Sequence, residues 1–417
     1  MRTILFEDAQ WRRLLPLTAL KSTLALRCGI LPLWERADRA LEGGLDGLAC
    51  RHEAAAAWLI DLPSRPLNPG GTEPTLWLNA RVIWTSERLD QARHLEPGRS
   101  LTGPRGEPLA AVAELEADTP DLGRRIEEAT ETMGEADWPV LGTWYDLLAH
   151  NPAAIIDDAV LLGLKTVPEV PAGVHRVGEY GLWMGEGAVI MPGSVLDTRE
   201  GPIFLDEGAE VMANAFLQGP CYVGRDSLVR VGSVLYEGCS LGRRCKVGGE
   251  LEAVLMQGFA NKQHGGYLGN AVVGEWVNLG AGTSNSDLKN TYGPVSTTVD
   301  GRGEDTGMIH LGCCLGDHTK TGINSMLNTG TVTGIACNLY GSGFPPAWVP
   351  DFIWGQPGRY TLHLLDRAVE TAGIVMARRD VEMNGAYEAL MRGWYEATAS
   401  DRESFLARPG NRPDPKR

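Results

Sequence analysis

Residues 205–248 read LDEGAEVMANAFLQGPCYVGRDSLVRVGSVLYEGCSLGRRCKVG, with an aliphatic side chain at every sixth position. The same period begins at Met184 and returns, after two longer interruptions, at Leu315. A small side chain, such as Cys221, follows most of these aliphatic residues by four positions. A period of six fits neither an α-helix nor a simple β-strand, whereas it is typical of a parallel β-helix. The sequence therefore predicts a left-handed parallel β-helix of hexapeptide repeats over residues 184–345.

Three domains are expected along the chain. Residues 1–160 mix short apolar strands with amphipathic helical segments and predict a reduced α/β domain. The β-helix domain is placed at residues 175–345. Residues 346–417 predict a helical extension that caps the β-helix, because the open end of a β-helix is an unpaired sheet edge. A buried strand is expected over residues 75–85, and a disordered, proline-rich tail over 408–417.

The charge balance of the chain argues against nucleic acid as a partner. The formal net charge is −15 at pH 7, and affinity for phosphate backbones depends on clustered lysine and arginine. No apolar stretch reaches the ~20 residues that cross a membrane, and no signal peptide is expected. The eight cysteines form no C-x-x-C pair, so we expect a cytoplasmic protein with free thiols. Four cysteines occupy the small inward position of the repeat and are predicted to be buried side chains rather than metal ligands: Cys221, Cys239, Cys245 and Cys337.

The two interruptions of the repeat are the first candidates for a functional site. They span about residues 254–272 and 286–308 and predict loops expelled from the β-helix, which often carry function. His264 lies in the first interruption and is followed by Gly265 and Gly266, which let a backbone approach a ligand closely. Taken alone, a histidine in such a loop is more often a surface residue without a role.

A resemblance to a known family changes that balance. Residues 264–283 read HGGYLGNAVVGEWVNLGAGT and resemble the acetyltransferase domain of GlmU, a family that joins glucosamine-1-phosphate acetyltransferase to N-acetylglucosamine-1-phosphate uridyltransferase. Residues 228–252 resemble the coils that precede this string, and residues 12–31 resemble the first turn of sugar nucleotidyltransferases. The order of domains matches the GlmU-like sugar nucleotidyltransferases. The resemblance implies a transferase of nucleotide-sugar and cell-envelope biosynthesis that acts on a small sugar phosphate or nucleotide sugar.

The resemblance also implies roles for residues of the β-helix. His264 matches the general base that takes a proton from the amino-sugar nitrogen, and its titration range suits that task. The acyl donor is acetyl-CoA, and a homotrimer is implied, with clefts between neighbouring β-helices. The thioester would lie beside the backbone of Gly280, Ala281 and Gly282. Substrate binding is expected from Arg230 at a phosphate and from Tyr267, Asn278 and Asp287.

The β-helix departs from the family pattern in two places. The run 284–289 replaces the Asn-Tyr pair that follows the G-A-G-T string, and the lysine pair expected after Glu252 is absent. His318 and Lys320 form a further polar cluster. It is open whether this cluster faces the acyl-donor cleft or is an outward polar edge of ordinary coils.

The N-terminal domain departs further. Arg13 fits the R-x-x-P-L-T core of the family, but an acidic segment that begins at Glu7 replaces the preceding Gly-rich phosphate loop. Carboxylates repel a nucleoside triphosphate unless a metal such as Mg²⁺ intervenes. Asn79 stands where the family presents a metal-binding aspartate, so the metal ligands are unknown. Weak nucleotide binding is expected from Arg13, Lys21 and Arg27.

Three functions are compatible with these features. The preferred one is acetyl-CoA-dependent acyl transfer to an amino sugar phosphate or a sugar nucleotide. The second is nucleotidyl transfer to a sugar-1-phosphate with Mg²⁺, in which the β-helix only trimerises the protein. The third is a non-catalytic scaffold that binds a sugar nucleotide. Thiol release from acetyl-CoA would support the first, and pyrophosphate exchange with UTP or dTTP the second.

Overall fold

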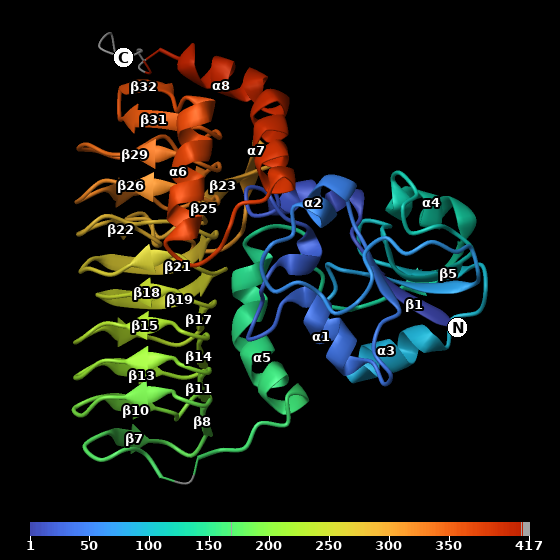
Figure 1. Ribbon diagram of the computed structural model, residues 1–417, viewed down its shortest axis with the longest axis horizontal. Coiled ribbons are helices and arrows are strands. Elements are labelled where there is room, and N and C mark those ends of the chain that lie inside the picture. Colours follow the sequence, from blue (N-terminus) through green and yellow to red (C-terminus); the bar gives the residue numbers. More distant parts are fainter. Residues whose placement is uncertain (168, 410, 412–417) are drawn as a thin grey trace.

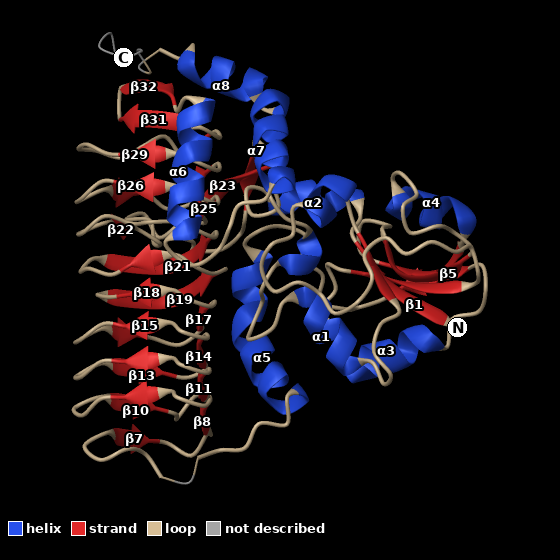
Figure 2. Cartoon of the chain, viewed as in Figure 1, coloured by secondary structure: helices blue, strands red, loops and turns tan. Residues whose placement is uncertain are grey.

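The computed structural model describes residues 1–167, 169–409 and 411, and it has three parts (Figures 1 and 2). An α/β part lies beside a long stack of parallel strands, and C-terminal helices lie along one end of the stack. This arrangement confirms the predicted fold class, an α/β part followed by a parallel β-helix and a helical cap. None of the helices in the described ranges is long and apolar enough to cross a membrane.

The N-terminal part is built on a six-stranded sheet. Its strands are β1 (Arg2–Phe6), β2 (Gly47–Ala49), β3 (Thr75–Asn79), β4 (Arg99–Thr102), β5 (Pro108–Ala113) and β6 (Glu131–Glu135). Its helices are η1 (Ala9–Leu14), η2 (Thr23–Ala25), α1 (Leu33–Ala40), α2 (His52–Ala56), α3 (Ser86–Arg93) and α4 (Leu122–Ala129). The strand order is β2-β1-β3-β5-β4-β6, with β1 parallel to both of its neighbours. The strand predicted over 75–85 ends at Asn79, where the side-chain amide donates to Asp8 and to the carbonyl of Pro108.

The β-helix has three faces, each a stack of short parallel strands. The first face holds β7 (His175–Val177), β10 (Val195–Asp197), β13 (Phe216–Gln218), β16 (Val234–Leu235) and the first halves of β19 (Glu250–Met256) and β21 (Tyr267–Val273). The second holds β8 (Leu182–Met184), β11 (Ile203–Leu205), β14 (Cys221–Val223), β17 (Cys239–Leu241), the second halves of β19 and β21, β25 (Cys314–Leu315), β28 (Val332–Thr333) and β30 (Trp348–Val349). The third holds β9 (Val189–Ile190), β12 (Glu210–Val211), β15 (Leu228–Val229), β18 (Lys246–Val247), β20 (Asn261–Lys262), β26 (Lys320–Thr321), β29 (Asn338–Leu339) and β31 (Ile353–Gln356). Separately, β22 (Ser284–Asn285) pairs with β27 (Met326–Leu327), and β32 (Arg359–Leu362) pairs antiparallel with β31.

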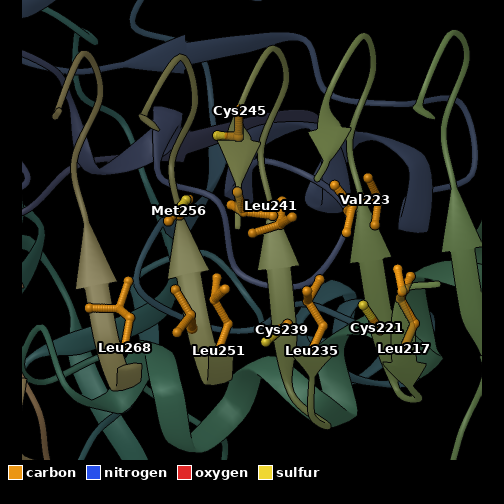
Figure 3. Packing of buried hydrophobic residues seen from close by; sticks show 14 of the residues in the cluster. Leu217, Cys221, Val223, Leu235, Cys239, Leu241, Cys245, Leu251, Met256 and Leu268 are labelled. Atoms are coloured by element: carbon orange, nitrogen blue, oxygen red, sulfur yellow. The ribbon is translucent and has the colours of Figure 1, made fainter. Parts of the chain in front are cut away.

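The interior of the β-helix confirms the register predicted from the repeat. Cys221 pairs with Cys239, eighteen residues later, as one coil stacks on the next. The side chains of Cys221, Cys239 and Cys245 are 0% exposed and lie among the inward aliphatic residues (Figure 3). Burial raises the pKa of the Cys239 and Cys245 thiols to about 12, so these cysteines are inert core side chains.

The first predicted loop, residues 254–272, is instead an ordinary coil, so that prediction is wrong. β19 and β21 pair in parallel across this segment, with Leu251 opposite Leu268, seventeen residues later. The preceding step, from Leu235 to Leu251, takes only sixteen residues. These shortened coils shift the phase of the six-residue period, and the repeat disappears from the sequence while the fold continues.

The second predicted loop is expelled from the β-helix. It contains the hairpin of β23 (Ser296–Val299) and β24 (Arg302–Asp305), which reaches the N-terminal part. The indole nitrogen of Trp144 donates to the carbonyl of Thr298 at 3.2 Å. Arg12 forms an ion pair with Asp300 at 3.1 Å. The hairpin is therefore a strap between the two parts.

The N-terminal part also lies along one face of the β-helix. α5 (Asp146–Leu161) runs beside this face (Figure 1). Trp144 and Leu147 pack there against apolar side chains that point outward from the second face. Burying each such side chain contributes ~1.5–3 kcal/mol, so this contact is an extension of the core. The outward row consists of Leu255, Val272, Cys314 and Val332.

The C-terminal helices occupy two positions. α8 (Ala399–Leu406) lies across the end of the β-helix, where Phe405 packs on Tyr360 with ring centroids 5.2 Å apart (Figure 1). It forms the predicted cap. α6 (Leu365–Ala377) and α7 (Gly385–Ala397) instead run back along one corner of the β-helix. The tail predicted to be disordered includes residues 410 and 412–417, which lie outside the described residues.

The corner under α6 and α7 carries aromatic side chains rather than the small or polar ones of an exposed corner. Phe259 and Trp276 have positive φ, and their rings stack at 4.1 Å. His318 continues this row, 6.1 Å from Trp276. All three are buried with apolar side chains of the helices nearby. α6 and α7 bury this aromatic row, which explains why they run along this corner of the β-helix.

Candidate functional site

His264 lies in the turn that joins β20 on the third face to β21 on the first face. Its side chain is exposed, and its imidazole has no hydrogen-bond partner within the described parts of the chain. Lys262 points into the β-helix, and its Nζ donates to the carbonyls of His264 and Gly248, both at 2.9 Å. Burial lowers the pKa of Lys262 to about 8. A buried lysine therefore fixes the turn that presents His264.

A pair of carboxylates lies on the first face beside this turn. The Tyr267 hydroxyl donates to Glu252 at 3.0 Å and contacts Asp287 at 2.9 Å. Asn270 donates to the same Asp287 oxygen at 2.8 Å. Burial, together with the two carboxylates, raises the pKa of Tyr267 far above its usual range, so the phenol stays protonated. The predicted substrate residues Tyr267 and Asp287 thus form one cluster.

Gly269 makes the Tyr267 conformation possible. A Cβ at Gly269 would lie 2.1 Å from the Tyr267 hydroxyl, well inside van der Waals contact. The tyrosine side chain therefore lies flat across this glycine to reach both carboxylates. The sequence string places Tyr-Leu-Gly together, and the structure supplies the reason for the glycine.

The third face is cationic on the other side of the turn. Lys246 pairs with Asn261, Asn261 faces Asn278, and Asn278 faces Lys320, so the four form one outward row. The predicted residue Asn278 is exposed and lines a cavity of about 430 Å³ with these side chains. Arg378 and Arg379, which follow α6, close its other side.

The remaining predicted residues of the β-helix have distinct surroundings. Arg230 is half-buried one coil below Lys246 and contributes to lowering the pKa of Lys246, after burial and Arg379. The backbone N–H of Gly282 donates to the carbonyl of Gly265 at 3.0 Å, so this strip supports the His264 turn. The strip also contains Gly280 and Ala281, whose carbonyl accepts from Asn324.

The side chains of His318 and Lys320 point into different environments. His318 is buried, and its Nε2 lies 2.9 Å from the Tyr387 hydroxyl of α7. Burial lowers the pKa of His318 well below its usual range, so it is neutral. Lys320 lines the cationic cavity instead. Only the lysine faces the same space as Asn278.

The three residues predicted to bind a nucleotide are engaged between the two parts of the protein. Arg13 pairs with Glu304 of the strap at 2.9 Å. Lys21 pairs with Glu275 at 2.9 Å and with Asp317 at 3.1 Å. The Arg27 guanidinium donates to the carbonyl of Ile30 and lies over the Tyr222 ring. Lys21 and Arg27 line one narrow cavity of about 40 Å³, and Arg13 is not among its lining residues.

A larger cavity of about 270 Å³ lies at the carboxyl ends of β1 and β2, where open α/β sheets bind ligands. Glu7 and Asp8 line it, but both are bound internally. Glu7 accepts from Ser22 and Arg51, and Asp8 forms an ion pair with Arg81 at 2.7 Å. Other lining carboxylates are Glu53, Asp118 and Asp121.

The acidic lining of this cavity forms no group of three metal-binding side chains within the described residues. In the described ranges, no three histidine, cysteine, aspartate or glutamate side chains are grouped so as to hold a metal ion. We therefore derive no reaction step through Mg²⁺. The same lining opposes the phosphates of a nucleoside triphosphate, since like charges repel.

Several site residues were missed by sequence reasoning. Glu252 was seen only as the residue before an absent lysine pair, and Arg378 and Arg379 lie in a helical extension with no recognisable motif. Lys246 shares one signal with Lys320, a residue of the predicted polar cluster, since both occupy the position just before an inward residue of the repeat. The outward row to which both lysines belong can be recognised only when neighbouring strands are stacked.

Comparisons with known proteins agree with the division of the chain into an N-terminal part and a β-helix. Residues 3–166 match the sugar nucleotidyl transferase family. The bifunctional sugar-1-phosphate nucleotidylyltransferase/acetyltransferase of Sulfurisphaera tokodaii is 31% identical over 147 residues, which are 34% of this chain and 36% of that protein. The bifunctional protein GlmU of Jannaschia sp. is 29% identical over 185 residues, 44% of this chain and 36% of that protein. Each match spans little more than a third of the relative.

Among solved structures, the chain is similar to Arabidopsis UDP-N-acetylglucosamine acyltransferase, at 10% identity and a TM-score of 0.30, over 51% of this chain and 80% of that one. The family match covers the N-terminal part, and each of these two curated relatives is similar to less than half of the chain. The chain thus joins a sugar nucleotidyl transferase domain to a hexapeptide β-helix of the acetyltransferase type, and it is a distant relative of the bifunctional GlmU proteins.

Proposed function

We propose that the β-helix transfers an acetyl group from acetyl-CoA to the amino group of a sugar phosphate or a nucleotide sugar. The observation that carries this proposal is the position of His264. Its exposed, unpaired imidazole lies at the corner between the cationic third face and the carboxylates of the first face. Such a corner suits reactants that carry phosphates and an ammonium group, because opposite charges are matched on both sides.

In the proposed reaction, His264 accepts a proton from the acceptor ammonium. The free amine attacks the thioester carbonyl, the new C–N bond forms and the C–S bond breaks. CoA leaves as a thiolate, and the second proton that the nitrogen loses as it becomes an amide converts this thiolate to the thiol. Glu252 and Asp287, linked by Tyr267, orient the ammonium before it loses its proton. The backbone of residues 280–282 is proposed to lie beside the thioester.

We also propose that a second copy of the chain completes the cleft within a homotrimer. His264 is exposed, and no described element of the same chain covers it. The first face carries two half-buried aromatic residues, Phe216 and Tyr236, with ring centroids 6.2 Å apart. Half-exposed aromatic side chains on a flat sheet face are suited to pack against another subunit.

The N-terminal part supports nucleotidyl transfer only through its family match. Its strand-end cavity is acidic, and Arg13, Lys21 and Arg27 are engaged in contacts between the two parts. We therefore propose that this part contributes little pyrophosphorylase activity and serves mainly to hold the β-helix. In this proposal, the β-helix rather than the N-terminal part binds the acceptor, which is a sugar phosphate or a nucleotide sugar.

The test uses the full chain, acetyl-CoA and a panel of amino sugar phosphates and nucleotide amino sugars, with thiol release as the readout. His264→Ala should lower kcat by ~10²–10⁴-fold, the usual contribution of a general base. Its melting temperature should not change, because the side chain is exposed. His175→Ala, an exposed histidine on β7, is the matched control and should retain the native rate. Absence of thiol release with every acceptor would refute acyl transfer, and native kcat in His264→Ala would refute the general base.

A further inference from the structure

The cavity on the third face has a lining of unusual charge. It measures about 430 Å³ and is lined by four cationic residues, Lys246, Lys320, Arg378 and Arg379. Its other lining residues are amides or apolar, and none of the described lining residues is a carboxylate. The chain as a whole carries a formal net charge of −15, so a cluster of one sign does not reflect its composition.

The cationic residues are held in place by the fold. Lys246 and Lys320 stand at the two ends of the outward row, with Asn261 and Asn278 between them. Neighbouring strands are ~4.8 Å apart, so the two lysine backbones are separated by ~14 Å. From the opposite side, Arg379 donates to Asn261 Oδ1 at 2.7 Å. Two ammonium groups, two amides and a guanidinium thus surround one space.

The usual reason for arginine at a helix end explains only part of this cluster. Arg378 and Arg379 directly follow α6, and cations are favoured there by the helix dipole. That preference does not place Lys246 and Lys320 on the wall opposite. None of the four is within ion-pair distance of a carboxylate in the described residues.

The cluster is unfavourable without a counter-ion. Burial, and then the charges of Arg379, Arg230 and Arg378, lower the pKa of Lys246. Burial lowers the pKa of Lys320 to about 8, and its Nζ donates to the carbonyl of His318 at 2.9 Å. Like charges that are partly removed from water destabilise a fold unless something neutralises them. An anionic ligand would offset this cost.

We infer that this cavity binds the diphosphate of a nucleotide-bearing ligand. Two linked phosphates present more oxygen atoms to the four lining cations than a single phosphate does, and lysine and arginine are the usual phosphate ligands. The volume lies within the range of small-molecule sites. Gln263, the neighbour of His264, lines the same cavity. The inference therefore rests on the proposed function and identifies where the diphosphate of the donor or of a nucleotide sugar lies.

The test is equilibrium binding by calorimetry, with the full chain and three probes: CoA, UDP and inorganic pyrophosphate. Lys320→Met and Arg379→Gln should each weaken binding by about tenfold or more, as expected for loss of a charged hydrogen bond. Arg367→Gln is the matched control, since Arg367 lies on α6, is exposed and pairs with Glu370. It should bind as the native chain does. Pantetheine lacks the diphosphate, and its affinity should not respond to any of the variants.

The relative affinities for CoA and UDP indicate which ligand supplies the diphosphate. Tighter binding of CoA than of UDP assigns the cavity to the acyl donor, and the reverse assigns it to a nucleotide sugar. Native affinity for all three probes in both variants, or no binding of any probe to the native chain, overturns the inference. Thermal melting without ligand separates a binding role from a structural one. A structural Lys320 would lower the melting temperature when replaced by Met, whereas an unneutralised cation should leave it unchanged or raise it.

Failure of the diphosphate site and failure of the proposed acyl transfer can be told apart. Loss of binding in Lys320→Met together with no thiol release in the native chain would keep the diphosphate site and refute acyl transfer. Thiol release that depends on His264, together with native probe affinity in Lys320→Met and Arg379→Gln, would keep acyl transfer and refute the diphosphate site.

Discussion

The Nζ of Lys21, in the N-terminal part, lies 3.1 Å from Oδ2 of Asp317, a β-helix residue whose side chain is 0% exposed. Burial alone would lower the pKa of Lys21, but Asp317 and Glu275 raise it above its usual value. The ammonium is therefore held charged at the junction of the two parts. Lys21, at which the sequence resemblance implies nucleotide binding, thus has ion-pair partners in the β-helix.

Lys21→Met should destabilise the protein strongly, because it leaves two carboxylates without their counter-charge. Breaking one partner of a buried ion pair typically costs ~3–5 kcal/mol of unfolding free energy, to be measured by urea denaturation. Asp317→Asn added to Lys21→Met should recover part of the loss, since the buried charge is then gone. If Lys21→Met keeps native stability, the ion pair does not hold the two parts together.

Gly269→Ala should disrupt the carboxylate cluster without replacing any polar atom. The added methyl would lie 2.1 Å from the Tyr267 hydroxyl, so the ring must move away from Glu252 and Asp287. We expect acetyl transfer to fall to the level of Tyr267→Phe, measured as kcat/KM for the amine acceptor. Gly265→Ala is the control, because a Cβ there has no atom within 4 Å. Equal loss in both glycine variants would indicate a general effect on the turn.

Pyrophosphate exchange with UTP or dTTP should be weak or absent in the native chain. The cavity at the ends of β1 and β2 is lined by three carboxylates that form no ion pair within the described residues, and these repel a triphosphate: Glu53, Asp118 and Asp121. Radiolabelled pyrophosphate exchange with a panel of sugar-1-phosphates measures this. Robust turnover that Arg13→Ala abolishes would contradict the expectation and restore nucleotidyl transfer as the main activity.

Light scattering should give the mass of a homotrimer at micromolar concentration. The uncovered first face is the expected contact, and Phe216→Asp on that face should shift the mass towards the monomer by placing a charge in an apolar contact. Acetyl transfer should fall with it if a neighbour completes the cleft. A native monomer would mean that one chain forms the whole site.

The sequence predicted the β-helix well because inward positions are constrained at every coil. Leu217 and Cys221 repeat one coil later as Leu235 and Cys239, and a core of fixed width accepts only such side chains. The prediction was wrong around residues 254–272, where shortened coils removed the period but not the strand pairing. A change of phase and an expelled loop look alike in a single sequence.

Prediction of the candidate site was limited for a different reason. Tyr267 and Asp287 are twenty residues apart, yet their side chains meet. The resemblance implies substrate binding for both, but Asp287 lies beyond the 264–283 string, so the sequence did not predict their contact. Lys320 and Arg379 line the same cationic cavity but come from elements that share no local pattern. Outward residues of a β-helix do not constrain one another until a helix packs over them, so sequence periodicity carries no information about that contact.

The contacts between the N-terminal part and the β-helix fix how long the β-helix can be. Asn151 binds the carbonyl of Gly238, Arg27 binds Gln257, and Lys21 binds Asp317, so the attachment points are distributed over successive coils. Repeat proteins commonly gain or lose whole repeats during evolution, because each repeat contacts only its neighbours. Here an extra coil between Gln257 and Asp317 would move Asp317 by ~4.8 Å and separate it from Lys21. A change in the number of coils between Gly238 and Asp317 should therefore be disfavoured, because it would break at least one of these attachments.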